Sequence, residues 1–446
     1  MKPGVALGCA LLLAAFGAAG PAPAEPSSET VPLTLPDVVA RARAHSARLA
    51  QLADLEAAAA AGVRGARAAR WPSVDVSASY ARNSDVPELT LVSPGPPPTR
   101  QTVFPNIPHT YRARAGLNLP LYAGGRISAG ITSAQQLRDA AARDREGGEA
   151  DLVLETTRAY WSLVAARESA RVLAEAIVSY EAHLTEARNR LDFGLAARNE
   201  VLLVQVERER AELSRLEAAN RARVANADLV RLAGLPPGAQ VEPTEPLAAP
   251  PPPDAEIDSL VETALSGRPE IAAMRARIAA AASSVQVARS AGRPQLGFSA
   301  GYDYARPNAR ILPLRDEWND TWSLGVSLSV TAFDGGRTAA AVAQARAQAD
   351  AQRHQLEDLA GRIRLEVTGR ALDLETARAQ VGVAVRALAA AKESVQVLGD
   401  RYRQGVSPSF ELLDAETRAL TAGLDLTLAT TQLRVAMASL DRAVGP

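Results

Sequence analysis

The same pattern of residues occurs twice in this chain of 446 residues, and the duplication limits the folds open to it. The motif at 124–126 (Gly-Gly-Arg) recurs at 335–337, and Glu200 recurs as Glu411, both at an offset of 211 residues. Solenoid repeats have periods of about 20–50 residues, so a unit of roughly 210 residues is too long for a solenoid. The sequence therefore predicts two copies of one long unit, each forming half of a single fold.

The N-terminal residues have the features of a secretory signal. Lys2 supplies a positive charge, residues 5–16 form an apolar run, and 22–24 (Ala-Pro-Ala) match a cleavage site. The single cysteine, Cys9, lies inside the apolar run, so the exported chain would contain no disulfide. We expect a signal peptide at 1–24, a first repeat at 25–240, a Pro-rich linker at 241–256 and a second repeat at 257–446.

Two pairs of segments alternate between apolar and polar residues with a period of two. This pattern predicts β-hairpins at 72–122 and 294–332, with strands over 74–80, 111–119, 296–304 and 322–330. Alternation over about ten residues, with aromatic residues near the ends, is typical of strands that cross a bilayer in a barrel. The loops inside the hairpins are polar and rich in proline, and we expect them to be long and mobile.

The remaining segments favour helix. The first helix of each repeat is expected at 36–69 and at 258–291, and each ends before a proline, which cannot continue a helix. A helix of about 65 residues follows each Gly-Gly-Arg motif, and its heptad spacing of apolar residues predicts coiled-coil packing. Glycine ends each long helix, within 193–195 and 404–406, and a return helix follows. The expected fold is mostly α-helical with a small β part.

Four strands are too few to close a barrel, because the smallest barrels need about eight. An open sheet edge is not tolerated in lipid, so other copies of the chain would have to complete the sheet. The polar faces of the strands would then line a water-filled lumen, with Arg112 and Arg114 among the lining residues. The sequence therefore predicts a tube that opens at an outer membrane and continues below it as long helices.

Several classes of function find no support in the sequence. A net charge of -1 argues against a nucleic-acid partner held by a basic surface. The four histidines are scattered without the spacing of metal ligands, and the chain has no nucleophile elbow, phosphate-binding loop or cysteine cluster. We therefore predict no enzyme activity, no cofactor and no metal.

The paired corners, the paired turns and the stretches 402–405 (Tyr-Arg-Gln-Gly) and 411–415 (Glu-Leu-Leu-Asp-Ala) resemble the TolC-like outer membrane factor family of efflux and secretion ducts. The resemblance covers essentially the whole exported chain. It implies a homotrimer whose strands form a transmembrane β-barrel, four from each chain, continuous with an α-barrel of long coiled-coil helices. It also implies contact with outer-membrane lipid and two partners, a periplasmic adaptor (membrane fusion) protein and an inner-membrane pump.

The resemblance also implies roles for residues at the turns. Family members contact the adaptor through their tips, which correspond here to Phe193, Gly194, Leu195, Gln404, Gly405 and Val406. Rings of acids narrow the periplasmic end of the family's ducts, and Glu411 and Asp414 match them. The alternative is structural: acids suit the first turn of any helix because they stabilise its dipole, and the tip residues then serve only as turns.

Polar links between hairpins hold the closed state in the family, and Tyr402 and Glu200 match two of their participants. A basic residue often follows the second tip glycine, but Ser407 stands there, followed by Pro408. Arg198 or Arg403 is then the candidate to complete the link.

The favoured function is the outer membrane duct of a tripartite efflux system that passes small molecules to the exterior. Two alternatives stay open at this point. The duct could instead serve type I protein secretion, or the chain could be a periplasmic coiled-coil scaffold whose strands form only a small cap sheet.

Overall fold

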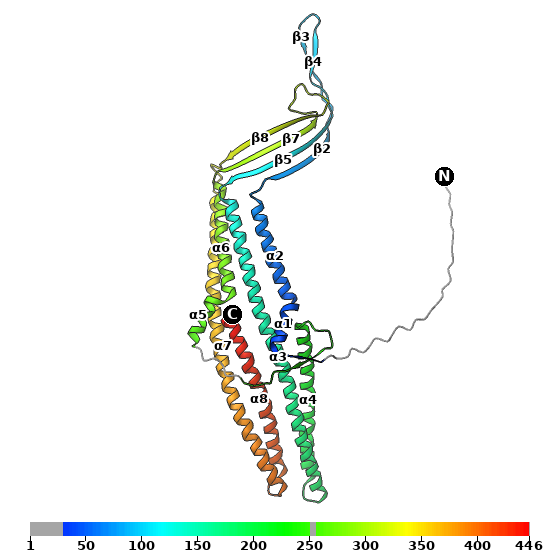
Figure 1. Ribbon diagram of the computed structural model, residues 1–446, viewed down its shortest axis with the longest axis vertical. Coiled ribbons are helices and arrows are strands. Elements are labelled where there is room, and N and C mark those ends of the chain that lie inside the picture. The colour runs from blue at the N-terminus through cyan, green and yellow to red at the C-terminus, as the bar shows by residue number, and fades with distance from the viewer. Residues whose placement is uncertain (1–29, 250–255, 446) are drawn as a thin grey trace, which may run out of the picture.

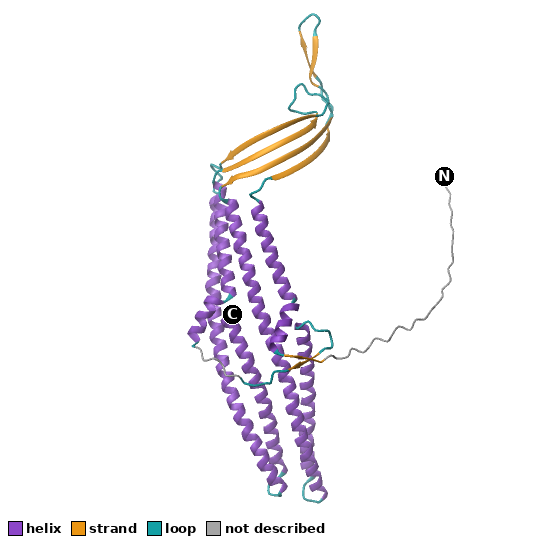
Figure 2. Ribbon diagram, viewed as in Figure 1, coloured by secondary structure: helices purple, strands orange, loops and turns teal. Residues whose placement is uncertain are grey.

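The computed structural model describes residues 30–249 and 256–445 and has a long helical bundle with a sheet at one end (Figure 1; Figure 2). The first part contains β1 (Thr30–Leu33), α1 (Leu35–His45), α2 (Ala47–Ala68), β2 (Ser73–Arg82), β3 (Leu89–Ser93), β4 (Thr99–Phe104), β5 (His109–Ala123), α3 (Arg126–Asp192), α4 (Arg198–Leu232) and β6 (Gln240–Pro243). The second part contains α5 (Ile257–Gly267), α6 (Pro269–Arg289), the 3-10 helix η1 (Ser290–Gly292), β7 (Gln295–Arg306), β8 (Asn319–Ser329), α7 (Arg337–Arg403) and α8 (Ser409–Val444). The signal peptide expected at 1–24 lies outside the described residues.

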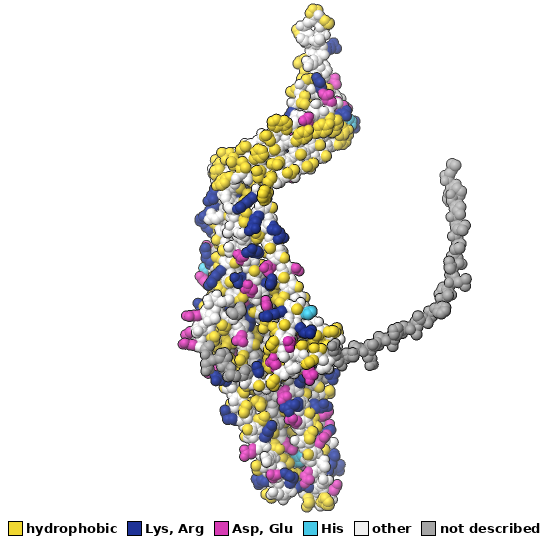
Figure 3. All heavy atoms as spheres, viewed as in Figure 1, with side chains coloured by type: hydrophobic (Ala, Val, Ile, Leu, Met, Phe, Trp, Pro, Cys, Tyr) yellow, Lys and Arg dark blue, Asp and Glu magenta, His cyan; other side chains and the backbone are white. Residues whose placement is uncertain are grey.

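Strands β2, β5, β7 and β8 form one antiparallel sheet in that order. The register places apolar positions side by side, because Val76 pairs with Ala115, Ala115 with Tyr302, and Tyr302 with Trp322. One face of the sheet is therefore apolar, and its side chains on β2 and β8 are exposed in a single chain. Figure 3 shows hydrophobic side chains gathered over the sheet, whereas charged side chains are scattered over the helices.

Helices α3 and α7 each have 67 residues, which confirms the predicted length. Each begins after a glycine with a φ of 89°, a left-handed conformation that glycine adopts without a Cβ penalty. Helices α1, α2 and α4 lie along α3, and helices α5, α6 and α8 lie along α7 (Figure 1). The predicted heptad seams face these shorter helices: Ile177, Tyr180 and Leu184 pack against Val201 and Val204 of α4.

The first helix of each repeat is two helices rather than the single element expected at 36–69 and 258–291. In the first repeat, Ser46 has an extended backbone, and its hydroxyl accepts the N–H of Leu49 to cap a new helix. In the second repeat, Pro269 begins the new helix, and Arg268 before it is extended because a residue that precedes proline avoids the α conformation. The sequence signals at the breaks are single residues within continuous apolar patterns: a capping serine in the first repeat and a proline in the second.

Two further strand pairs were not predicted. β1 pairs in parallel with β6, so part of the expected Pro-rich linker at 241–256 joins the start of the described chain in a small sheet. β3 and β4 form an antiparallel hairpin inside the first loop, and it projects beyond the main sheet (Figure 2). Both pairs consist of short strands, which lack the sustained alternation of apolar and polar residues that predicts a strand.

Candidate functional site

The turns between the long and return helices lie at the end of the bundle opposite the sheet (Figure 1). The N–H of Leu195 donates to the carbonyl of Arg190 (2.7 Å), and the N–H of Val406 donates to that of Arg401 (2.9 Å). The intervening glycines have φ values of 72° and 77°, as this type of helix termination requires. Both turns are therefore built in the same way.

The side chains at these turns are exposed and largely apolar. Phe193 is 81% exposed, Leu195 77% and Val406 62%, and Gln404 is exposed beside Val406. Gly194 and Gly405 supply the bend and no side chain. An apolar cluster held in water at the end of a bundle is the kind of surface that another protein covers.

Glu411 and Asp414 lie in the first turns of α8, beside the second tip. Glu411 accepts a hydrogen bond from the hydroxyl of Ser407. Asp414 forms an exposed ion pair with Arg418, at 2.8 Å between Oδ2 and Nε. The structure therefore gives each acid a partner close by in the chain, and neither acid is buried.

Tyr402 is buried near the end of α7, where Arg190 of α3 holds it. The guanidinium of Arg190 lies over the Tyr402 ring, 4.2 Å from its centroid, and donates to the backbone carbonyls of Tyr402 and Arg403. Burial raises the pKa of Tyr402 despite the nearby Ser409 hydroxyl, and the phenol makes no hydrogen bond of good geometry within the described chain. Sequence reasoning did not assign this role to Arg190.

The other predicted members of the link, Glu200, Arg198 and Arg403, make no hydrogen bond to the Tyr402 hydroxyl within the described chain. Glu200 is in the first turn of α4, near enough for its charge to act on Tyr402. Arg403 donates to Asp400 of its own helix, and Arg198 begins α4 with no ion pair inside 30–249 and 256–445. In a single chain, Arg190 is the basic residue that packs on the Tyr402 ring, and a link through Arg198 or Arg403 stays a prediction.

A buried polar cluster joins the two hairpins a short way above the tips. His183 of α3 bonds to Glu416 (2.8 Å from Nδ1 to Oε2) and to the Ser409 hydroxyl (3.0 Å from Nε2), both on α8. Its ring also packs edge-on against Tyr402 at 5.2 Å between centroids. The sequence shows His183 as an isolated histidine, and its partners lie more than 200 residues away, so no local pattern could have found them.

Arg112 and Arg114 lie on the polar face of the sheet, opposite Ser79 and Ser77 of β2. Both approach Asp303 of β7, with Nε to Oδ1 distances of 2.8 Å for Arg112 and 3.9 Å for Arg114. The predicted lining residues are therefore on the face expected for them, and their charge is partly balanced.

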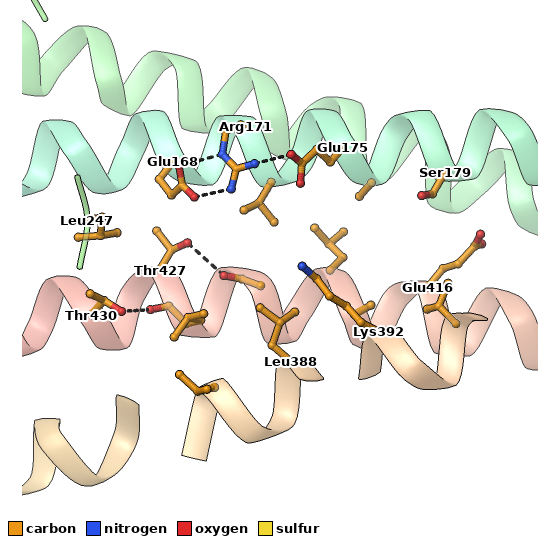
Figure 4. Close-up of a pocket in the computed structure, with 18 of the residues that line it drawn as sticks. Glu168, Arg171, Glu175, Ser179, Leu247, Leu388, Lys392, Glu416, Thr427 and Thr430 are labelled. Atoms are coloured by element: carbon orange, nitrogen blue, oxygen red, sulfur yellow. Dashed lines mark hydrogen bonds and ion pairs between the residues drawn. The ribbon is translucent and has the colours of Figure 1, made fainter. Parts of the chain in front are cut away.

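A groove of about 460 Å³ runs between α3, α7 and α8 (Figure 4). Val172, Val385 and Leu420 give it apolar walls, and Leu247, which follows β6, lies at one end. Lys392 of α7 points into the groove and forms no ion pair within the described chain. It is the only lysine of the sequence besides Lys2.

Helix α8 turns opposite faces to this groove and to open water. Residues that line the groove recur every seven positions at Glu416, Gly423 and Thr430. Exposed residues recur at the same interval, two positions earlier, at Asp414, Thr421 and Leu428. Residues two apart on a helix are separated by about 200°, so the two rows lie on opposite sides. We call the exposed side of α8 the charged row; it comprises the half-buried Glu411 and the exposed Asp414, Arg418, Thr421, Asp425 and Leu428.

No helix in the described part of the chain is both long enough and apolar enough to cross a membrane. Among the same residues, no group of three or more His, Cys, Asp or Glu side chains is arranged to hold a metal ion.

Comparison with known proteins agrees with this architecture. The sequence model of the outer membrane efflux protein family matches residues 38–235 and 260–446. The chain belongs to the outer membrane efflux protein family. Protein CyaE of Bordetella pertussis is 28% identical over 332 residues, which cover 73% of this chain and 68% of the relative. Outer membrane protein OprJ of Pseudomonas aeruginosa is 27% identical over 338 residues, which cover 74% of this chain and 70% of the relative.

Solved structures share the fold. The outer membrane protein VceC of Vibrio cholerae matches with a TM-score of 0.76 at 19% identity, covering 92% of this chain and 96% of that structure. This outer membrane efflux protein is therefore a channel for efflux or secretion in the outer membrane, with a large periplasmic part. The predicted family and location are confirmed, and a periplasmic scaffold without a channel is set aside.

Proposed function

We propose that three copies of this outer membrane efflux protein form the exit duct of a tripartite system, which passes small molecules from an inner-membrane pump and a periplasmic adaptor to the exterior. The observation that carries the proposal is that each layer of the chain ends in an open edge. β2 and β8 have no outer partner strand among the described residues, although their apolar side chains are exposed. Lipid cannot satisfy such backbone edges, whereas the next copy can.

The helical layer supports the same arrangement. α4 exposes an apolar row at helical spacing, formed by Leu202, Val206, Leu213, Leu216 and Val224. α7 exposes another at intervals that are mostly multiples of seven, formed by Leu365, Leu372, Val383 and Val397. Rows with this spacing pack well against a neighbouring helix, so α4 of one copy and α7 of the next would close the ring.

In this ring the polar face of the sheet lines the lumen, with Arg112 and Arg114, and the apolar face meets outer-membrane lipid. The charged row of α8 also faces the axis. The groove lies on the opposite side of α8 and is lined in part by Leu247 and Ala249, which belong to the segment between the two repeats. Because this segment passes over the bundle, the groove side of α8 faces the outside of the tube. Glu411 and Asp414 then lie at the periplasmic constriction, and Tyr402 and Glu200 lie beside them at the junction of the hairpins.

The exposed tips would receive the adaptor. Phe193, Leu195 and Val406 supply apolar contacts, Gln404 supplies a polar one, and Gly194 and Gly405 keep the turns tight. The bundle places both turns at one end of the molecule, so one adaptor ring can reach all of them (Figure 2).

Native mass spectrometry of the detergent-purified protein tests the ring. We expect a trimer that conducts ions in planar bilayers, and a monomer that conducts none would overturn the proposal. The double change Leu213→Asp and Val383→Asp should abolish the trimer, whereas Val178→Asp, on an exposed position of α3, should keep it.

Deletion of the gene tests the cargo. We expect greater susceptibility to drugs and dyes, restored by the native gene but not by a gene carrying Phe193→Asp and Val406→Asp. Unchanged susceptibility together with the loss of one exported protein would show protein secretion instead.

A further inference from the structure

The charged row of α8 changes sign along its length. Glu411 and Asp414 are acidic, Arg418 is basic, and Asp425 is acidic again. The first three lie within about two turns of helix, so the acids of the proposed constriction are followed at once by a cation. The rise of about 1.5 Å per residue puts Arg418 about 6 Å further along the helix than Asp414.

The ion pair of Asp414 and Arg418 contributes little to the stability of the helix. Their side chains are 60% and 75% exposed, and water screens a pair of this kind strongly. Arg418 also lies beyond the first turn of α8, where the helix dipole has no strong effect. What the pair does change is the electric field in the water beside α8.

The first hairpin does not carry this arrangement. At the repeat offset, Leu203 of α4 corresponds to Asp414, and Glu207 corresponds to Arg418. An acid followed by a base, in the direction away from the tip, therefore occurs in α8 alone. The first repeat does not share this pattern.

We propose that Arg418 sets the charge selectivity of the duct. Three copies of Arg418 form a cationic ring directly beyond the acidic ring of Glu411 and Asp414. Arg418 lies about 6 Å from Asp414 along the helix, which is less than the Debye length of about 10 Å at 0.1 M salt, so the fields of these two rings overlap and partly cancel. The constriction then admits anionic and zwitterionic small molecules that an acidic ring alone would repel. This inference rests on the proposed function, because it requires the charged row to face the lumen.

Reversal potentials in planar bilayers under a KCl gradient measure this selectivity directly. Arg418→Gln should raise the ratio of potassium to chloride permeability several-fold at about 0.1 M salt. The rise should shrink at about 1 M, where the Debye length is about 3 Å. Asp414→Asn should change the ratio in the opposite direction. Arg171→Gln, on the groove side of α3, is the matched control and should leave the ratio unchanged.

The outcomes separate this inference from the proposed function. If Asp414→Asn shifts the ratio but Arg418→Gln does not, the cationic ring is wrong and the acidic constriction stands. If neither change has an effect in a channel that still conducts, the charged row does not line the constriction. The cationic ring and the acidic constriction are then both wrong, and the duct itself stands. A shift with Arg171→Gln as large as that with Arg418→Gln would show a general effect of charge and overturn the role of Arg418.

Discussion

Helices α3 and α7 have the same length and equivalent places in the two repeats, yet they bury very different surfaces. Nineteen residues of α3 are buried in the single chain, but only seven residues of α7 are. α3 contacts α2, α4, α6 and α8, whereas α7 packs against α5, α6 and α8. The duplicated helix is therefore interior in one repeat and at an edge in the other, and its residues differ accordingly.

One pair of positions shows this difference clearly. Gly147 and Gly148 of α3 face neighbouring helices: a Cβ built on Gly148 would clash with the side chain of Leu52 on α2, and one on Gly147 would touch Glu270 of α6. The equivalent residues of α7 are Asp358 and Leu359, and Asp358 forms an exposed ion pair with Arg362. Small residues allow α3 to sit between other helices, and α7 does not need them in the single chain.

The largest difference between the repeats is expected at equivalent arginines. Arg442 is 10% exposed and pairs with Asp151 (2.7 Å) and Glu270, whereas Arg231 is 63% exposed and pairs with Asp228 and Glu155. Arg442→Ala removes two charge-assisted hydrogen bonds from a partly buried site, although Asp151 keeps Arg48 and Glu270 keeps Arg268 as partners. The change should lower the free energy of unfolding by about 3 kcal/mol. Arg231→Ala should cost at most about 1 kcal/mol. Denaturant unfolding followed by far-UV circular dichroism compares the two variants, and equal losses would contradict the contrast.

The glycine corners before the long helices give the next effect. Gly124 and Gly335 have similar φ values of 62° and 66°, so alanine strains both. A Cβ at Gly124 would also lie 2.9 Å from Ser290 and Arg293, whereas Gly335 has open space around it. Gly124→Ala should therefore cost about 2–4 kcal/mol, and Gly335→Ala about 1–2 kcal/mol in a lone chain.

Assembly should erase part of this second difference. In the proposed ring, the end of α2 from the next copy would lie beside Gly335, as Ser290 and Arg293 lie beside Gly124. We therefore expect Gly335→Ala to lower the yield of trimer as Gly124→Ala does. A native yield for Gly335→Ala in native mass spectrometry would argue against ring closure at this corner.

Acid should weaken the second repeat through Glu270. Burial alone would raise the pKa of Glu270, but hydrogen bonds from Arg268 and Arg442 outweigh burial and lower the pKa from 4.5 to about 2. Because the folded pKa lies below the unfolded one, this carboxylate stabilises the fold above about pH 4.5 and loses that effect as the pH falls toward 2. The loss should reach up to about 3 kcal/mol. Unfolding measured across this pH range should depend less on pH in Glu270→Gln, and an unchanged slope would refute the assignment.

The smallest expected effect is at the buried histidine. His183→Ala leaves Glu416 and Ser409 without a partner and should cost about 1–3 kcal/mol. The equivalent residue of α7, Ser394, is exposed, and Ser394→Ala should change stability by less than about 0.5 kcal/mol. Hydrogen exchange near the tips offers a local readout, and it should rise in His183→Ala alone.

Periodic features of the fold could be predicted from the sequence. The alternation around Tyr302 placed β7, and the heptad through Tyr180 and Leu184 placed the seam of α3. The breaks at Ser46 and Arg268 were missed because a single residue, the capping Ser46 or Pro269, interrupts an apolar pattern that continues on both sides. Features without a periodic pattern could be found only from the three-dimensional structure.

The site shows the same division. Gly194 and Gly405 predicted the turns, because the positive φ of these positions favours glycine. The contacts of Arg190 with Tyr402 and of His183 with Glu416 join residues more than 200 positions apart. Such contacts depend on how hairpins pack, and a single sequence carries no local signal of that packing.

The groove between α3, α7 and α8 contains the only internal amine of the described chain. Once the expected signal peptide, which contains Lys2, has been removed, an acylating reagent will therefore modify the folded molecule at Lys392, apart from any free chain terminus. Because the reaction rate depends on access to that amine, anything that covers or narrows the groove will slow the labelling. The chain thus carries its own footprinting probe, and a mass increment of one acyl group per copy is enough to read it.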